Sequence, residues 1–144
     1  MSADNPQRRL DIRLGWLGGI IDGEGMITVI KRSNGYNFCP RISIANTDKI
    51  LLDEVEKIFK ELNLSYHFQS KSYKVGEKEK IKFEITVNGL RRCSKVLPLI
   101  IPFLISKKER AEKLLLWCEY RLSKKSRERY TEKDKEILSI RQRV

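Results

Sequence analysis

Hydrophobic and polar residues alternate along several segments of this chain, and the alternation predicts two β-hairpins. Residues 81–88 read IKFEITVN, so that every second side chain is apolar. A period of two is typical of a strand with one buried face. Residues 26–32 and 40–46 are rich in β-branched residues and flank the polar sequence SNGYN, which predicts the first hairpin. Residues 66–73 and 81–88, joined by a turn around Gly76, are expected to form the second.

Before and between these hairpins, apolar residues recur with the helical period. Residues 10–22, with the sequence LDIRLGWLGGIID, carry apolar side chains on two faces, which predicts a helix that is buried on both. The sequence Asn-Thr-Asp48 is a helix-start signal. It precedes an apolar stripe made up of Leu51, Val55, Ile58 and Leu62. We therefore expect an amphipathic second helix between the two hairpins.

Further short helices are predicted after the second hairpin. Residues 90–97 are expected to form a helix that ends at Pro98, because proline disfavours the helical conformation of the residue before it. The spacing from Ser106 to Glu109 is that of a capping box, which predicts the start of another helix. A similar pattern over residues 131–134 predicts a last short helix.

The predicted order of helices and strands is α-ββ-α-ββ-α, followed by short helical segments. Two consecutive hairpins, each preceded by a helix, favour an α+β fold with one four-stranded antiparallel sheet. Helices would cover one face of the sheet, and the other face would be polar. A length of 144 residues suits a single domain. We expect a flexible leader over residues 1–9, the domain over 10–124, and a basic helical tail of that domain over 125–144.

The chain carries a large excess of positive charge, and the charge is unevenly distributed. The sequence holds 30 Lys and Arg against 19 Asp and Glu, for a formal net charge of +11. Residues 48–64 contain five acids and three bases, whereas residues 90–110 contain six bases and one acid. Such an excess indicates a polyanionic partner. The acids are expected to lie on the second helix, away from the surface that binds this partner.

Several classes of location and chemistry are excluded. No apolar stretch approaches the roughly 20 residues that span a bilayer, and the N-terminal sequence lacks a signal-peptide core. We therefore expect an intracellular, soluble protein of the cytoplasm or an organelle matrix. Three cysteines without a CxxC spacing argue against a disulfide framework or a zinc site. The single histidine, His67, leaves histidine-ligated metal hydrolases with too few ligands.

Residues 17–25, LGGIIDGEG, combine glycines and acids in a way that helix stability does not favour. A glycine costs about 1 kcal/mol relative to alanine inside a helix, and carboxylates near a helix C-terminus oppose the helix dipole. The glycines are explained either by tight packing against the protein's own sheet or by contact with the same helix of a second copy. The carboxylates of Asp22 and Glu24 in a basic protein indicate a hard divalent cation such as Mg²⁺.

The sequence LGGIIDGEG resembles, over all nine positions, the LAGLIDADG motif of the homing endonucleases encoded in introns and inteins. The resemblance covers roughly residues 10–122. It implies that Glu24 is the acidic metal ligand, that the carbonyl of Gly23 assists, and that Asp22 supports the helix end. The cofactor would be Mg²⁺, with Mn²⁺ or Ca²⁺ able to substitute in binding. The motif helix would form a dimer interface through Leu14, Leu17, Gly18, Ile21 and Asp22.

Two further positions are implied by the same resemblance. The stretch PFLISK, which ends at Lys107, is similar to the family segment that ends in a catalytic lysine, and Lys108 is the alternative one residue on. Asp48 lies at the start of the second helix, where the family often has a polar residue. Asp48 would either position the nucleophilic water or complement the helix dipole.

The function implied is hydrolysis of DNA across the minor groove of a long pseudo-palindromic site, leaving 3′ overhangs. Because the motif occurs once, cutting both strands requires a homodimer. Strands of about ten residues span ~33 Å, so two subunits would cover about twenty base pairs. The polar face forms the DNA-binding saddle, and its DNA-binding residues would be Thr28, Ile30, Arg32, Asn34, Arg41, Ser43, His67, Gln69, Lys71, Tyr73, Lys82, Glu84 and Thr86.

Two other functions remain open from the sequence. Relatives in the family assist intron splicing, so the chain could bind its own intron RNA as a maturase. It could also be a DNA-binding regulator that uses this fold without cleavage. The (D/E)xK core of restriction-type nucleases is absent, because no lysine has an acid two positions before it.

Overall fold

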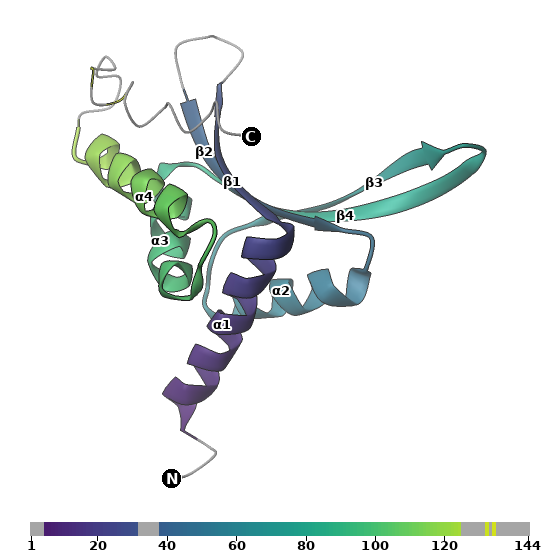
Figure 1. Cartoon of the computed structure of the whole chain (residues 1–144), viewed down its shortest axis with the longest axis horizontal. Helices are drawn as coiled ribbons and strands as arrows, with labels where there is room; N and C mark the ends of the chain where they lie inside the picture. Colours follow the sequence, from purple (N-terminus) through teal and green to yellow (C-terminus); the bar gives the residue numbers. More distant parts are fainter. Residues whose placement is uncertain (1–4, 32–37, 125–131, 133, 135–144) are drawn as a thin grey trace.

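The computed structural model describes residues 5–31, 38–124, 132 and 134 (Figure 1). Helices and strands follow the order that the sequence predicts, with a short 3₁₀ helix, η1, inserted before the last helix. The elements are α1 (Pro6–Glu24), β1 (Gly25–Lys31), β2 (Phe38–Asn46), α2 (Lys49–Glu61), β3 (His67–Val75), β4 (Lys78–Asn88), α3 (Leu90–Ile100), η1 (Ile101–Phe103) and α4 (Lys108–Leu122).

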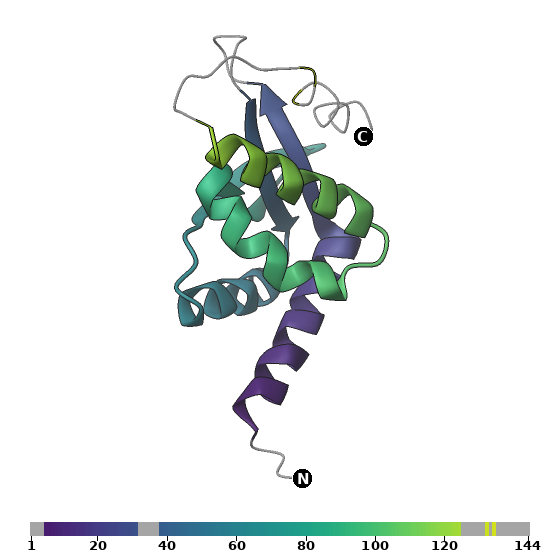
Figure 2. The same cartoon turned by 90° about the vertical axis from the view of Figure 1, so that its left-hand side faces the viewer.

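The four strands form one antiparallel sheet in the order β1-β2-β4-β3, which confirms the predicted fold class. In the β2–β4 pairing, Ile44 lies opposite Ile85 and Ser43 opposite Thr86, so that apolar and polar side chains separate onto the two faces. The helices cover the apolar face, and the β3–β4 hairpin extends away from them (Figure 1). Turned by 90°, the molecule shows α3 and α4 in front of the sheet (Figure 2).

The core fills the space between the sheet and the helices. The amphipathic stripe of α2 contributes Val55, Ile58 and Phe59, each at most 1% exposed, and α4 contributes the fully buried Trp117. Leu51 and Leu62, which the sequence placed in the stripe, pack at its edges and are partly buried. Burial of this apolar surface is the main source of stability, at about 25 cal/mol per Å² removed from water.

Helix α1 begins earlier than predicted and is buried on one face only. The side chain of Asn5 accepts a hydrogen bond from the backbone N–H of Gln7 at 3.0 Å, and Pro6 occupies the first helical position. Residues 6–9, expected in a flexible leader, are therefore helical. The face that includes Leu14 and Leu17 packs on the core. On the second predicted face Ile20 is partly buried and Trp16 is exposed, so full burial on two faces is wrong within one chain.

Two predicted boundaries around η1 are also wrong. Helix α3 continues through Pro98 to Ile100, because proline removes only one backbone hydrogen bond while the neighbouring turn buries Leu97 and Ile100. The predicted capping box does not form. Helix α4 begins at Lys108 without a side-chain cap, and the Ser106 hydroxyl instead donates to the Asp22 carboxylate.

Some predictions fall on residues outside the described part of the chain. These are Arg32 and Asn34, the polar loop between β1 and β2, and most of the C-terminal tail. Of that tail, Asp134 is fully buried, and the indole N–H of Trp117 donates to its carboxylate at 2.9 Å. All three cysteines are free in this structure. Over the described residues, no helix combines the length and apolar character needed to cross a membrane.

Candidate active site

The motif helix ends at Glu24, and the chain turns directly from there into strand β1. Glu24 is exposed at the last position of α1. Gly25, which begins β1, makes the turn possible, because a Cβ at this position would lie 2.8 Å from both the Cα and the carbonyl oxygen of Ile21. No real Cβ contact is that short. The sequence therefore places an acid at a helix end whose geometry depends on the following glycine.

The carboxylate of Asp22 ties the end of α1 to the segment before α4. It accepts hydrogen bonds from the backbone N–H groups of Ile105 at 2.6 Å and Lys107 at 3.0 Å, and from the Ser106 hydroxyl at 3.2 Å. Desolvation opposes the charged form, but these hydrogen bonds outweigh it and hold the pKa of Asp22 below its ordinary value of 3.8. Asp22, predicted at a dimer interface, is thus engaged by its own chain.

Lys107 is brought to the end of the motif helix. Its side-chain ammonium donates a hydrogen bond to the backbone carbonyl of Asp22, two residues before Glu24. The side chain is partly buried, whereas Lys108, the alternative, is exposed in the first turn of α4. Of the two lysines, Lys107 is therefore the one that the fold anchors beside the acidic end of α1.

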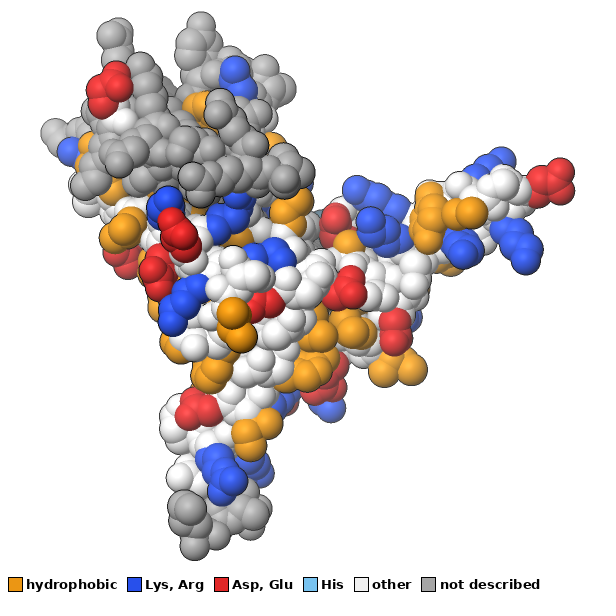
Figure 3. Space-filling view, in the orientation of Figure 1, with side chains coloured by type: hydrophobic (Ala, Val, Ile, Leu, Met, Phe, Trp, Pro, Cys, Tyr) orange, Lys and Arg blue, Asp and Glu red, His pale blue; other side chains and the backbone are white. Residues whose placement is uncertain are grey.

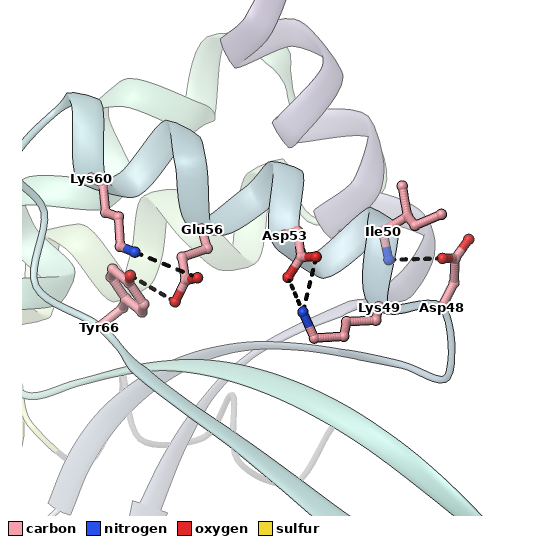
Figure 4. Close-up of polar contacts among 7 residues, drawn as sticks. All are labelled: Asp48, Lys49, Ile50, Asp53, Glu56, Lys60 and Tyr66. Atoms are coloured by element: carbon pink, nitrogen blue, oxygen red, sulfur yellow. Dashed lines mark hydrogen bonds and ion pairs between the residues drawn. The ribbon is translucent and has the colours of Figure 1, made fainter.

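Asp48 caps helix α2, as Figure 4 shows. Its carboxylate accepts a hydrogen bond from the N–H of Ile50 at 3.0 Å. The start signal in the sequence is confirmed, and the capping contact supports the interpretation that Asp48 complements the helix N-terminus. A role in positioning water stays a prediction.

The described residues offer few metal ligands within one chain. Nowhere among them do three or more His, Cys, Asp or Glu residues gather into a possible metal site. Glu24 offers an exposed carboxylate, and Gly23 lies in the last turn of α1, where carbonyl groups lack intrahelical donors. These hard oxygen donors fit Mg²⁺ or Ca²⁺. The remaining ligands would have to come from water, a phosphate or a second copy.

The polar face of the sheet collects most of the predicted DNA-binding residues. Strand pairing sets His67 opposite Thr86, Gln69 opposite Glu84, Lys71 opposite Lys82, and Thr28 opposite Arg41. Their side chains therefore share one face with Ile30, Ser43 and Tyr73. Two of the predicted DNA-binding residues are too buried to contact DNA directly. Ser43 and Thr86 are only 6% and 5% exposed, because they lie at the centre of the sheet between larger side chains.

Two lysines of this face were missed from the sequence. Strand β4 begins at Lys78 rather than at residue 81, and Lys78 and Lys80 pair with Val75 and Tyr73. Both are exposed on the face that carries Lys82. The alternation of lysines over 78–82 was the available signal. In Figure 3 the basic side chains along this hairpin, all of them lysines in the sequence, are drawn in blue.

The predicted dimer-interface residues lie in the protein's own core. Leu14, Leu17, Gly18 and Ile21 are buried, and a Cβ on Gly18 would lie 2.7 Å from the Cβ of Phe103 in η1. The exposed face of α1 is the opposite one. Its members share the spacing i, i+4, i+7 and i+11, and we call it the outer face of α1: Ile12, Trp16, Gly19 and Gly23.

The outer face of α1 is apolar and free of bulky side chains near Glu24. Ile12 is 63% and Trp16 38% exposed. A Cβ on Gly19 or Gly23 would meet nothing within 4 Å in this chain. The fold of one chain therefore gives no steric reason for these two glycines, unlike Gly18 and Gly25. Exposed apolar surface with close-approach glycines is typical of a helix–helix contact.

Comparison with known proteins agrees with the motif. A family model described as a LAGLIDADG-like domain matches residues 11–135. No curated protein matches the sequence. Among solved structures, the homing endonuclease I-CvuI, in complex with the I-CreI target in the presence of Mg and with the DNA not cleaved, has a TM-score of 0.58 and 17% identity, over 94% of this chain and 98% of that one.

Two other solved structures are similar. The archaeal intron-encoded homing endonuclease I-Vdi141I, complexed with DNA, has a TM-score of 0.51 and 16% identity, over 92% of this chain and 96% of that one. The LAGLIDADG homing endonuclease I-LtrWI, bound to target DNA, has a TM-score of 0.61 and 20% identity. The match covers 100% of this chain but only 45% of I-LtrWI. At these identities the likeness shows a shared fold.

Proposed function

The chain belongs to the family of LAGLIDADG-like domains, and on that premise we propose that it is a site-specific DNA endonuclease of the homing type. The observation that carries the proposal is the junction of α1 and β1. There an exposed acid, Glu24, follows a helix end to which Lys107 is anchored through Asp22. Contacts within one chain thus hold the ammonium group of Lys107 at the helix end that carries Glu24, beside a basic sheet face.

In this proposal the carboxylate of Glu24 and the carbonyl of Gly23 hold a divalent metal, Mg²⁺ by preference. When bound, such a metal lowers the pKa of a water nucleophile and neutralises charge on the phosphate and the leaving oxygen. Lys107 stabilises the negative charge that develops on the phosphate during hydrolysis. Asp48 is a secondary candidate for orienting water. Its capping bond to Ile50 supports a structural role first.

The substrate would be a long DNA duplex lying on the polar face of the sheet. Exposed Lys71, Lys78, Lys80 and Lys82 supply charge for phosphates. Gln69, His67 and Arg41 are of the residue types that read base edges in the major groove. Gln69 and Arg41 already have partners in this structure, Glu84 and Asn88, each at 2.6 Å. These bonds would have to open or be shared when DNA binds.

Cutting both strands would require two copies, because each chain holds one such site. We place the interface on the outer face of α1, which replaces the residues predicted from the sequence. A twofold axis along this face brings the two Glu24 residues near each other. This geometry suits cleavage across the minor groove of a pseudo-palindromic site, with 3′ overhangs as the expected product.

The test compares wild type with Glu24→Gln on duplexes from a randomised-site cleavage selection in Mg²⁺. Wild type is expected to cut both strands, and the variant to bind the same duplex without cutting it. The control is Glu54→Gln, which also removes one negative charge but at an exposed position of α2. Cleavage by Glu24→Gln would refute the mechanism. Binding without cleavage by wild type would favour the DNA-binding regulator, and preference for intron RNA over DNA would favour the maturase.

A further inference from the structure

We infer that Arg110 is a positioning residue of the active site. Its side chain binds strand β1, which begins directly after Glu24, to the start of α4, where Lys107 also lies. The inference rests on the proposed nuclease function and extends it to a residue of α4 that the motif does not include.

Arg110 reaches from the first turn of α4 to the outer edge of the sheet. Its Nε donates a hydrogen bond to the backbone carbonyl of Ile27, and its Nη2 lies 3.5 Å from the hydroxyl oxygen of Thr28. Among the described strands, β1 is an edge strand and pairs with β2 alone. Within that part of the chain its outward carbonyls have no strand partner, so a guanidinium bound there fixes an edge that pairing leaves open on one side.

The same turn of α4 also holds the motif helix. Lys107, three residues before Arg110, contacts Asp22 through both its backbone N–H and its ammonium group. Residues three apart lie on the same side of a helix. Residues at the start of α4 are therefore hydrogen-bonded to Asp22 and to residues 27–28, and Glu24 lies between these two attachment points.

The segment between these two attachment points, residues 23–26, needs contacts from other elements to fix its position. Glu24 is exposed and has a glycine on either side, Gly23 and Gly25. Glycine restricts the backbone less than any other residue. Fixing the chain on both sides of Glu24 sets the position of its carboxylate relative to Lys107. A misplacement of about 1 Å in such a site can cost on the order of 10²-fold in rate.

The chemistry of arginine suits this task, and that provides a discriminating variant. A guanidinium donates from several nitrogens in a fixed plane, whereas a lysine ammonium is a single point charge on a flexible stem. Arg110→Lys keeps the positive charge but cannot hold Ile27 and Thr28 in the same way. If Arg110 served only as a charge for DNA phosphates, lysine would replace it.

The experiment measures cleavage and binding separately for wild type, Arg110→Lys and Arg110→Met. Single-turnover cleavage is followed at saturating protein in Mg²⁺ on the selected duplex, DNA binding is measured in Ca²⁺, and Tm is recorded without DNA. Both variants are expected to cut about 10- to 100-fold more slowly. Their DNA affinity should stay close to that of wild type, and a higher Mg²⁺ concentration should be needed for half-maximal rate.

Lys113→Met is the matched control. Lys113 lies one turn further along α4, and its ion pair with Glu109, at 3.1 Å, is largely exposed. Such pairs contribute little to stability, so this variant should cut at the wild-type rate.

Three outcomes would overturn the inference. Arg110→Lys cutting at the wild-type rate would reduce Arg110 to a charge. A slower rate matched by equal losses in affinity and Tm would reduce it to a structural residue. Wild type that cuts no duplex would overturn the inference together with the proposed function. Where wild type cuts and Glu24→Gln does not, the proposed function stands whatever Arg110 does.

Discussion

Adjacent glycines in the motif helix are predicted to respond oppositely to alanine. Gly18 faces η1 of its own chain, and Gly19 faces outward. Gly18→Ala is expected to destabilise the folded chain. Gly19→Ala is expected to leave the fold intact and to weaken association of two copies.

The magnitude for Gly18→Ala follows from its neighbours. The new Cβ would lie 2.7 Å from the Cβ of Phe103 and 3.2 Å from the backbone carbonyl atoms of that residue. These atoms cannot move aside easily, because hydrogen bonds hold the residues that follow Phe103. The N–H of Leu104 donates to the carbonyl of Ile101, and the N–H of Ile105 donates to the Asp22 carboxylate. Overpacking of this kind costs about 1–3 kcal/mol. Better helix propensity returns up to ~1 kcal/mol, which leaves a net loss of about 1 kcal/mol at the middle of that range.

For a single chain, Gly19→Ala is expected to increase the free energy of unfolding, whereas Gly18→Ala lowers it. Its Cβ meets nothing within 4 Å, so the helix gains up to ~1 kcal/mol of propensity. In a dimer, each copy would bring an extra methyl group into the outer face of α1. A cost of about 1–3 kcal/mol there corresponds to a rise of roughly 5- to 150-fold in the dissociation constant of the dimer.

Analytical ultracentrifugation measures the dissociation constant of the dimer, and thermal unfolding at several protein concentrations separates folding from association. Gly18→Ala should lower Tm by roughly 2–4 °C at concentrations where the chain is monomeric. Gly19→Ala should not lower it there. An unchanged dimer constant in Gly19→Ala would refute the placement of the interface. A normal Tm in Gly18→Ala would refute the packing argument.

Three further predictions concern charge. Asp22→Asn should cost about 1–2 kcal/mol at neutral pH in denaturant unfolding. Because the pKa of Asp22 is lowered, the difference from wild type should vanish as pH falls below 3.8. Burial and Glu56 raise the pKa of Tyr66 to about 12. The contribution of the Tyr66 hydroxyl to stability is therefore expected to be lost as the pH rises from 10 to 12. In Glu56→Gln, ultraviolet titration should show a pKa of Tyr66 nearer 10.0. Lys80→Ala should reduce the salt slope of log affinity for DNA by about 0.9 per copy, whereas the exposed α2 variant Lys57→Ala should not.

The strands and the cap of α2 could be predicted because their signals are local. Strict alternation over residues 81–88 sets the buried face of β4 without reference to any other segment. Asp48 caps the helix that follows it directly. Lys78 and Lys80 were missed because lysine has low β-propensity. The hairpin pairing with β3, which extends the strand, is not visible in their own residue types.

The burial of α1 could not be predicted because it depends on distant segments. Apolar residues occur on both of its faces, so periodicity alone does not say which face meets the core. The choice is made by the segments that α1 meets in the fold, β1, β2, α3 and η1. Phe103 of η1 lies against Gly18. Ser106 lost its expected cap for a similar reason. As a cap, the Ser106 hydroxyl oxygen would accept from a backbone N–H, but α4 begins at Lys108, with Lys107 rather than Ser106 at its N-cap. Only the fold brings Asp22 within 3.2 Å of this hydroxyl, which donates to its carboxylate.

The acids of α2 affect DNA binding less than their number implies. Asp53 is paired with Lys49 at 3.0 Å, and Glu56 accepts from the Tyr66 hydroxyl at 2.8 Å (Figure 4). Glu54 and Glu61 both pair with Arg13 of α1. Four acids of α2 therefore have partners on the helical side, while the lysines of β4 stay exposed on the other face of the sheet. The field that reaches a duplex is set by these lysines, and Glu84, which Gln69 holds at 2.6 Å, is an acid of that face.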